Sequence, residues 1–136
     1  MELNYKDIFY NFIEAFIYLP KPENPLKKEL INSLNKKSIE FYQNLDRFSL
    51  DYETSSMIIL DSKYFTDDAY LYYFPMTIKN IIENNGLIEA IINRLKIIDL
   101  SHLNENQQSL IVQMIETLIE LKQKMDLSSD EFVLII

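Results

Sequence analysis

The sequence predicts an all-α protein in which residues 1–136 form one compact domain, a bundle of five to seven helices. Apolar residues recur every three to four positions in several segments, which is the spacing of amphipathic helices. The chain holds one glycine and four prolines, too few for the tight turns of a sandwich or barrel. With 48% apolar and 25% charged residues, its composition is typical of a chain that folds around a core.

A first helix is predicted over residues 4–19, because an apolar stripe runs along one of its faces. The stripe consists of Tyr5, Ile8, Phe9, Phe12, Ile13, Phe16 and Ile17. Asn4 can cap its start, and Pro20 ends it because proline lacks the donor that a continuing helix needs.

A second helix is predicted over residues 25–34, with Asn24 as its N-cap and Pro25 at its first position. Ser38 is the predicted cap of a short third helix that ends near Leu45. Residues 46–65 are less regular. We favour a helix for the apolar run at 57–60, because a lone strand would leave its backbone groups without partners.

The next helix is predicted to begin after Thr66, a good N-cap that two aspartates follow in the first turn. Pro75 is expected to kink this helix, since the apolar stripe resumes at Ile78. Gly86 is the expected left-handed residue just after its end.

Residues 87–98 are predicted to form a further helix, and Asn104 with Gln107 has the spacing of a capping box that opens the last long one. That helix carries the longest apolar stripe of the chain, which predicts a central place in the core. Ser128 offers another cap. The apolar tail at 132–136 is expected to dock on the bundle, because exposed it would promote aggregation.

Several classes of protein are excluded by what the chain lacks. It has no cysteine, no long apolar run and no signal-peptide pattern, which favours a cytoplasmic protein that does not span a membrane. His102 is the only histidine, and a single glycine rules out nucleophile elbows and phosphate-binding loops. We therefore predict a protein that is not an enzyme and has no catalytic residue, cofactor or metal site.

Charge points to the kind of partner. The chain has a net charge of −8, which repels nucleic acid and anionic lipid, so a basic protein is the expected partner. Residues 46–68 hold six acidic and two basic residues, and tyrosines lie among them. Tyr72 and Tyr73 are expected to face inward and Tyr70 outward. The predicted partner-binding residues are Asp51, Glu53, Asp61 and Tyr70.

The segment at 66–75, which reads TDDAYLYYFP, resembles the T-x-x-A-x-x-Y-Y-x-P signature of an uncharacterised family of small bacterial proteins. Residues 15–20 resemble the family's A-F-x-x-x-P, and residues 103–107 resemble its L-[ST]-x-x-Q. The similarity spans roughly residues 8–122, with Phe74 standing where leucine is usual. The resemblance implies a helical bacterial protein and supplies no activity.

The leading hypothesis is a non-enzymatic acidic domain that docks a basic protein, as immunity proteins and antitoxins dock toxins. One alternative is a metal-dependent hydrolase that uses the acidic cluster at 46–68. Another is a structural domain that self-associates through the tail at 132–136. The sequence does not predict the oligomeric state.

Overall fold

The computed structural model describes residues 5–81 and 85–135, and it describes the side chains of 6–78, 80 and 86–124. This part of the chain is all-α, as predicted, with seven α-helices, five short 3-10 helices and no strand. The α-helices are α1 (Tyr5–Phe16), α2 (Lys36–Gln43), α3 (Tyr52–Leu60), α4 (Asp67–Tyr73), α5 (Ile78–Ile81), α6 (Asn85–Lys96) and α7 (Glu105–Ile135).

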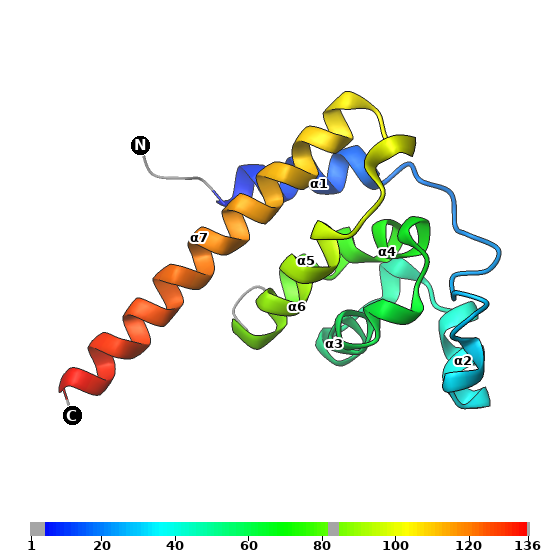
Figure 1. Ribbon diagram of the computed structural model, residues 1–136, viewed down its shortest axis with the longest axis horizontal. Helices are drawn as coiled ribbons and strands as arrows, with labels where there is room; N and C mark the ends of the chain where they lie inside the picture. The colour runs from blue at the N-terminus through cyan, green and yellow to red at the C-terminus, as the bar shows by residue number, and fades with distance from the viewer. Residues whose placement is uncertain (1–4, 82–84, 136) are drawn as a thin grey trace.

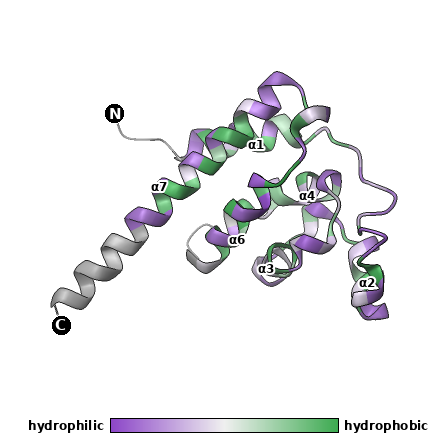
Figure 2. Cartoon of the chain, in the orientation of Figure 1, coloured by the Kyte–Doolittle hydropathy of each residue, from purple (hydrophilic) through white to green (hydrophobic). Residues whose placement is uncertain are grey.

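The helices pack as a bundle in which α7 lies along both α1 and α6, while α3 packs against α5 and α6 (Figure 1). Each packing helix carries both apolar and polar residues, so one side can be buried while the other meets water (Figure 2). The predicted stripe of the last helix is confirmed, because Leu110, Ile111, Met114 and Leu118 are all buried. No helix within the described ranges is long and apolar enough to cross a bilayer.

Aromatic rings make up much of the core. Phe12 of α1 meets Phe74 edge to face, with ring centroids 5.5 Å apart, and Tyr70 stacks on Phe74 with centroids 5.3 Å apart. Such pairs add roughly 0.5–1.5 kcal/mol to the burial of their surface. They join α1 to α4, two helices separated by 50 residues of chain.

The start of α4 is confirmed. The Thr66 hydroxyl accepts a hydrogen bond from the Ala69 amide at 3.2 Å, which satisfies one of the free donors of the first turn. At Pro75 the chain changes to a 3-10 turn, Phe74–Met76, before α5 begins. The bend predicted at this proline therefore takes the form of a 3-10 link between two α-helices.

The helix predicted over residues 25–34 is wrong. Leu26 instead forms an isolated antiparallel bridge with Phe65. The Lys27 amide donates to the Tyr64 carbonyl at 2.7 Å, and the Thr66 amide donates to the Pro25 carbonyl at 2.9 Å. Pairing with residues 64–66 satisfies the backbone at Pro25 and Lys27 without a helix, so the local signals at Asn24 and Pro25 are overruled. The rest of the segment forms turns and the short 3-10 helix η1 (Ile31–Ser33).

The cap of α2 also differs from the prediction. Asn35 caps this helix, since its side-chain oxygen accepts from the Ser38 amide at 2.8 Å. Ser38 therefore lies inside the first turn. The helix expected at 57–60 is confirmed as part of α3.

Gly86 does not end a helix, which makes the predicted left-handed role wrong. It is the second residue of α6, and no glycine in the described segments has a positive φ. The capping box of α7 is confirmed: Gln107 and Asn104 each accept from the other's backbone amide, at 3.1 and 2.8 Å. Because α7 continues to Ile135, Ser128 begins no new helix. The prediction that the tail at 132–136 docks on the bundle concerns side chains that the structure does not describe.

Candidate functional site

Three of the four predicted binding residues lie in α3 or at its ends. Asp51 is the N-cap of this helix, and Glu53 lies exposed in its first turn. The Asp51 carboxylate accepts from the Thr54 amide at 2.8 Å, and the Thr54 hydroxyl accepts from the Asp51 amide at 2.9 Å. The backbone hydrogen bond from Thr54 holds the pKa of Asp51 below its usual value. Both carboxylates therefore have a structural reason for their place at a helix start.

Asp61 lies at the other end of α3. It is half-buried, and its carboxylate accepts a hydrogen bond from the Tyr42 hydroxyl at 2.5 Å, which ties α2 to α3. Burial first, and then this hydrogen bond, raise the pKa of Tyr42 above its usual value. At 1.5 Å of rise per residue, Asp51 and Asp61 are about 15 Å apart along the helix. The structure thus brings Asp51 and Glu53 together and keeps Asp61 away from them.

The prediction that Tyr70 is exposed is wrong, because its side chain is fully buried. One face of its ring stacks on Phe74, and the guanidinium carbon of Arg94 lies 5.0 Å from the ring centroid. Helical spacing within α4 placed Tyr70 away from Tyr72 and Tyr73, which are buried as predicted. It could not reveal that α6 brings an arginine to cover that side.

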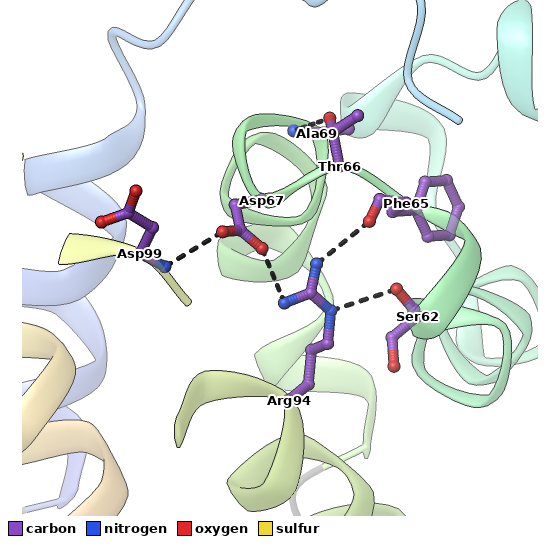
Figure 3. Close-up of polar contacts among 7 residues, drawn as sticks. All are labelled: Ser62, Phe65, Thr66, Asp67, Ala69, Arg94 and Asp99. Carbon is purple, nitrogen blue, oxygen red and sulfur yellow. Dashed lines mark hydrogen bonds and ion pairs between the residues drawn. The ribbon is translucent and has the colours of Figure 1, made fainter. Parts of the chain in front are cut away.

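The buried Arg94 side chain is the centre of a polar cluster that also fixes the position of the Asp67 carboxylate (Figure 3). Its guanidinium donates to the carbonyls of Ser62 and Phe65 at 3.1 and 3.0 Å, and it forms an ion pair with Asp67 at 2.9 Å. The second Asp67 oxygen accepts from the Asp99 amide at 3.0 Å. Asp67 therefore joins α4 to α6, so it is part of the fold's internal bonding and contributes little to an acidic surface.

The turn before α3 contains a residue that the sequence prediction missed. Phe48 lies in the 3-10 turn η2 (Arg47–Ser49), and its side chain is 64% exposed. Asp46 caps this turn by accepting from the Phe48 amide at 3.0 Å. A phenylalanine between two aspartates in a polar stretch is the signal that could have identified it.

Arg47 fixes this turn to the core. Its side chain is buried and donates a hydrogen bond to the Ile17 carbonyl. Its guanidinium carbon lies 4.2 Å from the centroid of Tyr72 and 5.0 Å from that of Phe48. The ring of Phe48 therefore lies against the Arg47 guanidinium, whose position is fixed by its contacts with Ile17 and Tyr72.

Carboxylates that form no salt bridge flank Phe48 in the sequence. Asp46, Asp51 and Glu53 are exposed, and none of them pairs with a basic side chain within the part of the chain that the structure describes. Tyr52, beside them, is also exposed. We call Asp46, Phe48, Asp51, Tyr52 and Glu53 the η2–α3 surface.

The described part of the chain offers little that could carry metal or acid–base chemistry. Over the described residues, no three histidine or acidic side chains lie close enough together to hold a metal ion. His102 is 81% exposed on its side chain and lies 3.8 Å from Asp99, at the surface between α6 and α7. Neither observation gives the alternative hydrolase hypothesis a candidate site.

Comparisons with protein-family models, with curated proteins and with solved structures found no match. The resemblance of residues 8–122 to a bacterial family therefore stays a prediction. Of its signature residues, Thr66 serves as a cap and Ala69 and Tyr72 are buried in the core.

Proposed function

We propose that the protein is a non-enzymatic binding domain that docks a basic protein, in the way that immunity proteins and antitoxins dock toxins. The observation that supports this function is the η2–α3 surface, where three exposed carboxylates that form no salt bridge among the described residues lie close in sequence to two exposed aromatic rings. Tyrosine and phenylalanine are enriched at protein interfaces, and a negative patch selects a positive partner. We place this function in the cytoplasm, because a chain without cysteine needs no oxidising compartment.

The charge of the whole chain supports the same partner. A net charge of −8 attracts a basic protein over about one Debye length, roughly 8–10 Å at physiological salt. Within that range the exposed Asp51 and Glu53 would orient the partner as it approaches. Asp61 adds negative charge at the far end of α3, while Tyr70 is removed from the set of contacts because it is buried.

The first test is purification of the tagged protein from its own cells at low salt, followed by native mass spectrometry. We expect a complex of defined stoichiometry with a protein of high isoelectric point. Recovery of free monomer or homodimer alone would contradict the proposed function.

The second test uses charge variants against that partner. Asp51→Asn keeps a good N-cap, and Glu53→Gln keeps the side-chain shape, so the double variant changes charge with little change in structure. We expect the association rate to fall several-fold, and the salt dependence to weaken. The matched control is Glu14→Gln with Glu116→Gln, two exposed acids on α1 and α7 that carry the same charge change. An equal effect in both double variants would show that net charge alone matters.

A further inference from the structure

We infer that Phe48 is the apolar anchor of this interface, and that its ring enters an apolar hollow on the basic partner while the neighbouring carboxylates bind the partner's cations. This inference rests on the proposed function. The inference adds to the proposed function the residue that supplies most of the contact energy, since charges at the rim of an interface mainly set association rate and specificity.

Phe48 is presented to solvent in a fixed position. Its amide is bound by the Asp46 carboxylate at 3.0 Å, so the turn that carries it is closed. Beneath the ring, the Arg47 guanidinium lies between Phe48 and Tyr72, and it also binds the Ile17 carbonyl. A side chain that is already ordered loses less conformational entropy when it binds, which is the property of a good anchor.

The carboxylates lie within reach of a partner that covers the ring. Asp46 and Phe48 are two residues apart and Phe48 and Asp51 three, so their backbones are separated by at most about 7 and 11 Å. Both distances are close to one Debye length at physiological salt. A cation beside the bound ring would therefore be attracted by both carboxylates, because screening at this distance weakens each interaction without removing it.

A surface hollow adjoins the same turn. It has a volume of about 550 Å³, and its lining includes Lys37, Glu40, Phe41, Leu45 and Asp46. Phe41 and Leu45 give it apolar walls, while Glu40 and Asp46 place carboxylates on it beside the single cation of Lys37. This composition suits a long basic side chain, whose apolar stem can pack while its charged end meets a carboxylate.

Charge decides between a basic partner and a second copy of the chain. Residues 40–53 hold four acidic residues and one basic residue, Arg47, whose guanidinium is buried. A symmetric dimer through this surface would bring the same carboxylates face to face, which opposes association. The same repulsion applies to nucleic acid and to anionic lipid.

The test uses two synthetic peptides with equal numbers of lysines, one alternating lysine with leucine and the other alternating lysine with glycine. Binding to the full-length protein is followed by NMR amide shifts at low salt. We expect both peptides to shift the amides of Asp51 and Glu53, and the leucine peptide to bind about tenfold more tightly, since burial of apolar side chains is worth more than a kcal/mol.

The substitution Phe48→Ala should abolish the advantage of the leucine peptide, and Phe48→Tyr should retain most of it. The matched control is Ile97→Ala, which removes an apolar side chain of similar exposure, 68%, from the end of α6. Because Phe48 is exposed, both alanine variants are expected to fold, and their amide spectra verify this directly.

Three results would overturn the inference, and they are distinguishable. If Phe48→Ala and Ile97→Ala leave the advantage equally intact while both peptides still bind at Asp51, the anchor is wrong and the proposed function stands. If neither peptide binds the unmodified protein, the proposed function fails as well. If sedimentation shows a homodimer that Phe48→Ala dissolves, the occupant is a second copy of the chain.

Discussion

The guanidinium of Arg94 lies over the buried ring of Tyr70, 5.0 Å from its centroid, and covers the one side of α4 that helical spacing predicts to face solvent. From this position it also holds Asp67 and two backbone carbonyls. A single side chain of α6 thus sets the environment of α4 and of the turn that precedes it.

Replacing Arg94 by alanine should destabilise the fold strongly. The change removes the donor of the Phe65 carbonyl and the cation of Asp67, and it leaves the Ser62 carbonyl with only the Phe65 amide at 3.2 Å. Loss of one partner of a buried ion pair costs about 3–5 kcal/mol, and the 33% exposure of Asp67 places the expected loss towards the lower end. The measurement is the free energy of unfolding from urea titrations followed by circular dichroism. Arg94→Lys should recover part of the loss, because it restores a charge and fewer hydrogen bonds. A loss below about 1 kcal/mol, the median for exposed pairs, would show that the cluster adds little.

Asp67 and Asp68 provide a matched pair of neighbouring aspartates. Both lie in the first turn of α4, so both interact with the helix dipole, but only Asp67 pairs with Arg94, which is 3% exposed. We expect Asp67→Asn to lower the free energy of unfolding by about 1–2 kcal/mol more than Asp68→Asn, a discounted figure because the Asp67 side chain is 33% exposed. Equal effects in the two variants would leave only the dipole contribution, and the ion pair would then have no measurable role.

Much of the fold follows from local signals. Thr66 and Asn104 are caps whose partners lie three residues ahead, and the stripes of α1 and α7 depend only on helical spacing, so each could be predicted from a short window. Residues 25–34 could not, because their extended start depends on hydrogen bonds with residues 64–66. Long-range pairing of this kind leaves no trace in a local pattern.

The candidate site shows the same division. Asp51 and Glu53 could be placed at an exposed helix start from charge and spacing alone. The burial of Tyr70 depends on Arg94, and the presentation of Phe48 depends on Arg47, which reaches Tyr72 and Ile17. Both arginines act across more than twenty residues of chain. Buried arginines therefore decide which aromatic side chains remain available to a partner.

Tyr70 and Tyr73 should respond in opposite directions to removal of their hydroxyl groups. Both side chains are fully buried, yet the Tyr70 hydroxyl finds no hydrogen-bond partner among the described residues, whereas the Tyr73 hydroxyl donates to the Leu45 carbonyl at 3.1 Å. An unsatisfied buried polar group costs about 1–3 kcal/mol. Tyr70→Phe should therefore raise the free energy of unfolding, and Tyr73→Phe should lower it by about 1 kcal/mol. Urea titration of both variants beside the unmodified protein measures the difference, and a destabilised Tyr70→Phe would mean that its hydroxyl is satisfied in solution.

The buried tyrosines also predict a loss of stability at alkaline pH. Burial raises the pKa of Tyr73 to about 12 and that of Tyr70 further, and the nearby charge of Arg94 only partly offsets the shift at Tyr70. Since these pKa values exceed the value of about 10 expected for an unfolded chain, the unfolded state loses protons first as pH rises. The stability that the neutral tyrosines provide is therefore complete below pH 10 and declines from about pH 10 towards 12.

We expect tyrosinate absorbance at alkaline pH to show a late phase that coincides with the loss of helical circular dichroism, because the buried hydroxyls ionise only when the fold opens. Tyr70→Phe removes one of these groups, so its unfolding midpoint should move to higher pH. Tyr18→Phe, which changes a ring that is 87% exposed, is the control and should leave the midpoint in place. If the absorbance change were complete before any helix is lost, the tyrosines would be ionising within the folded protein, and their burial could not be what limits its alkaline stability.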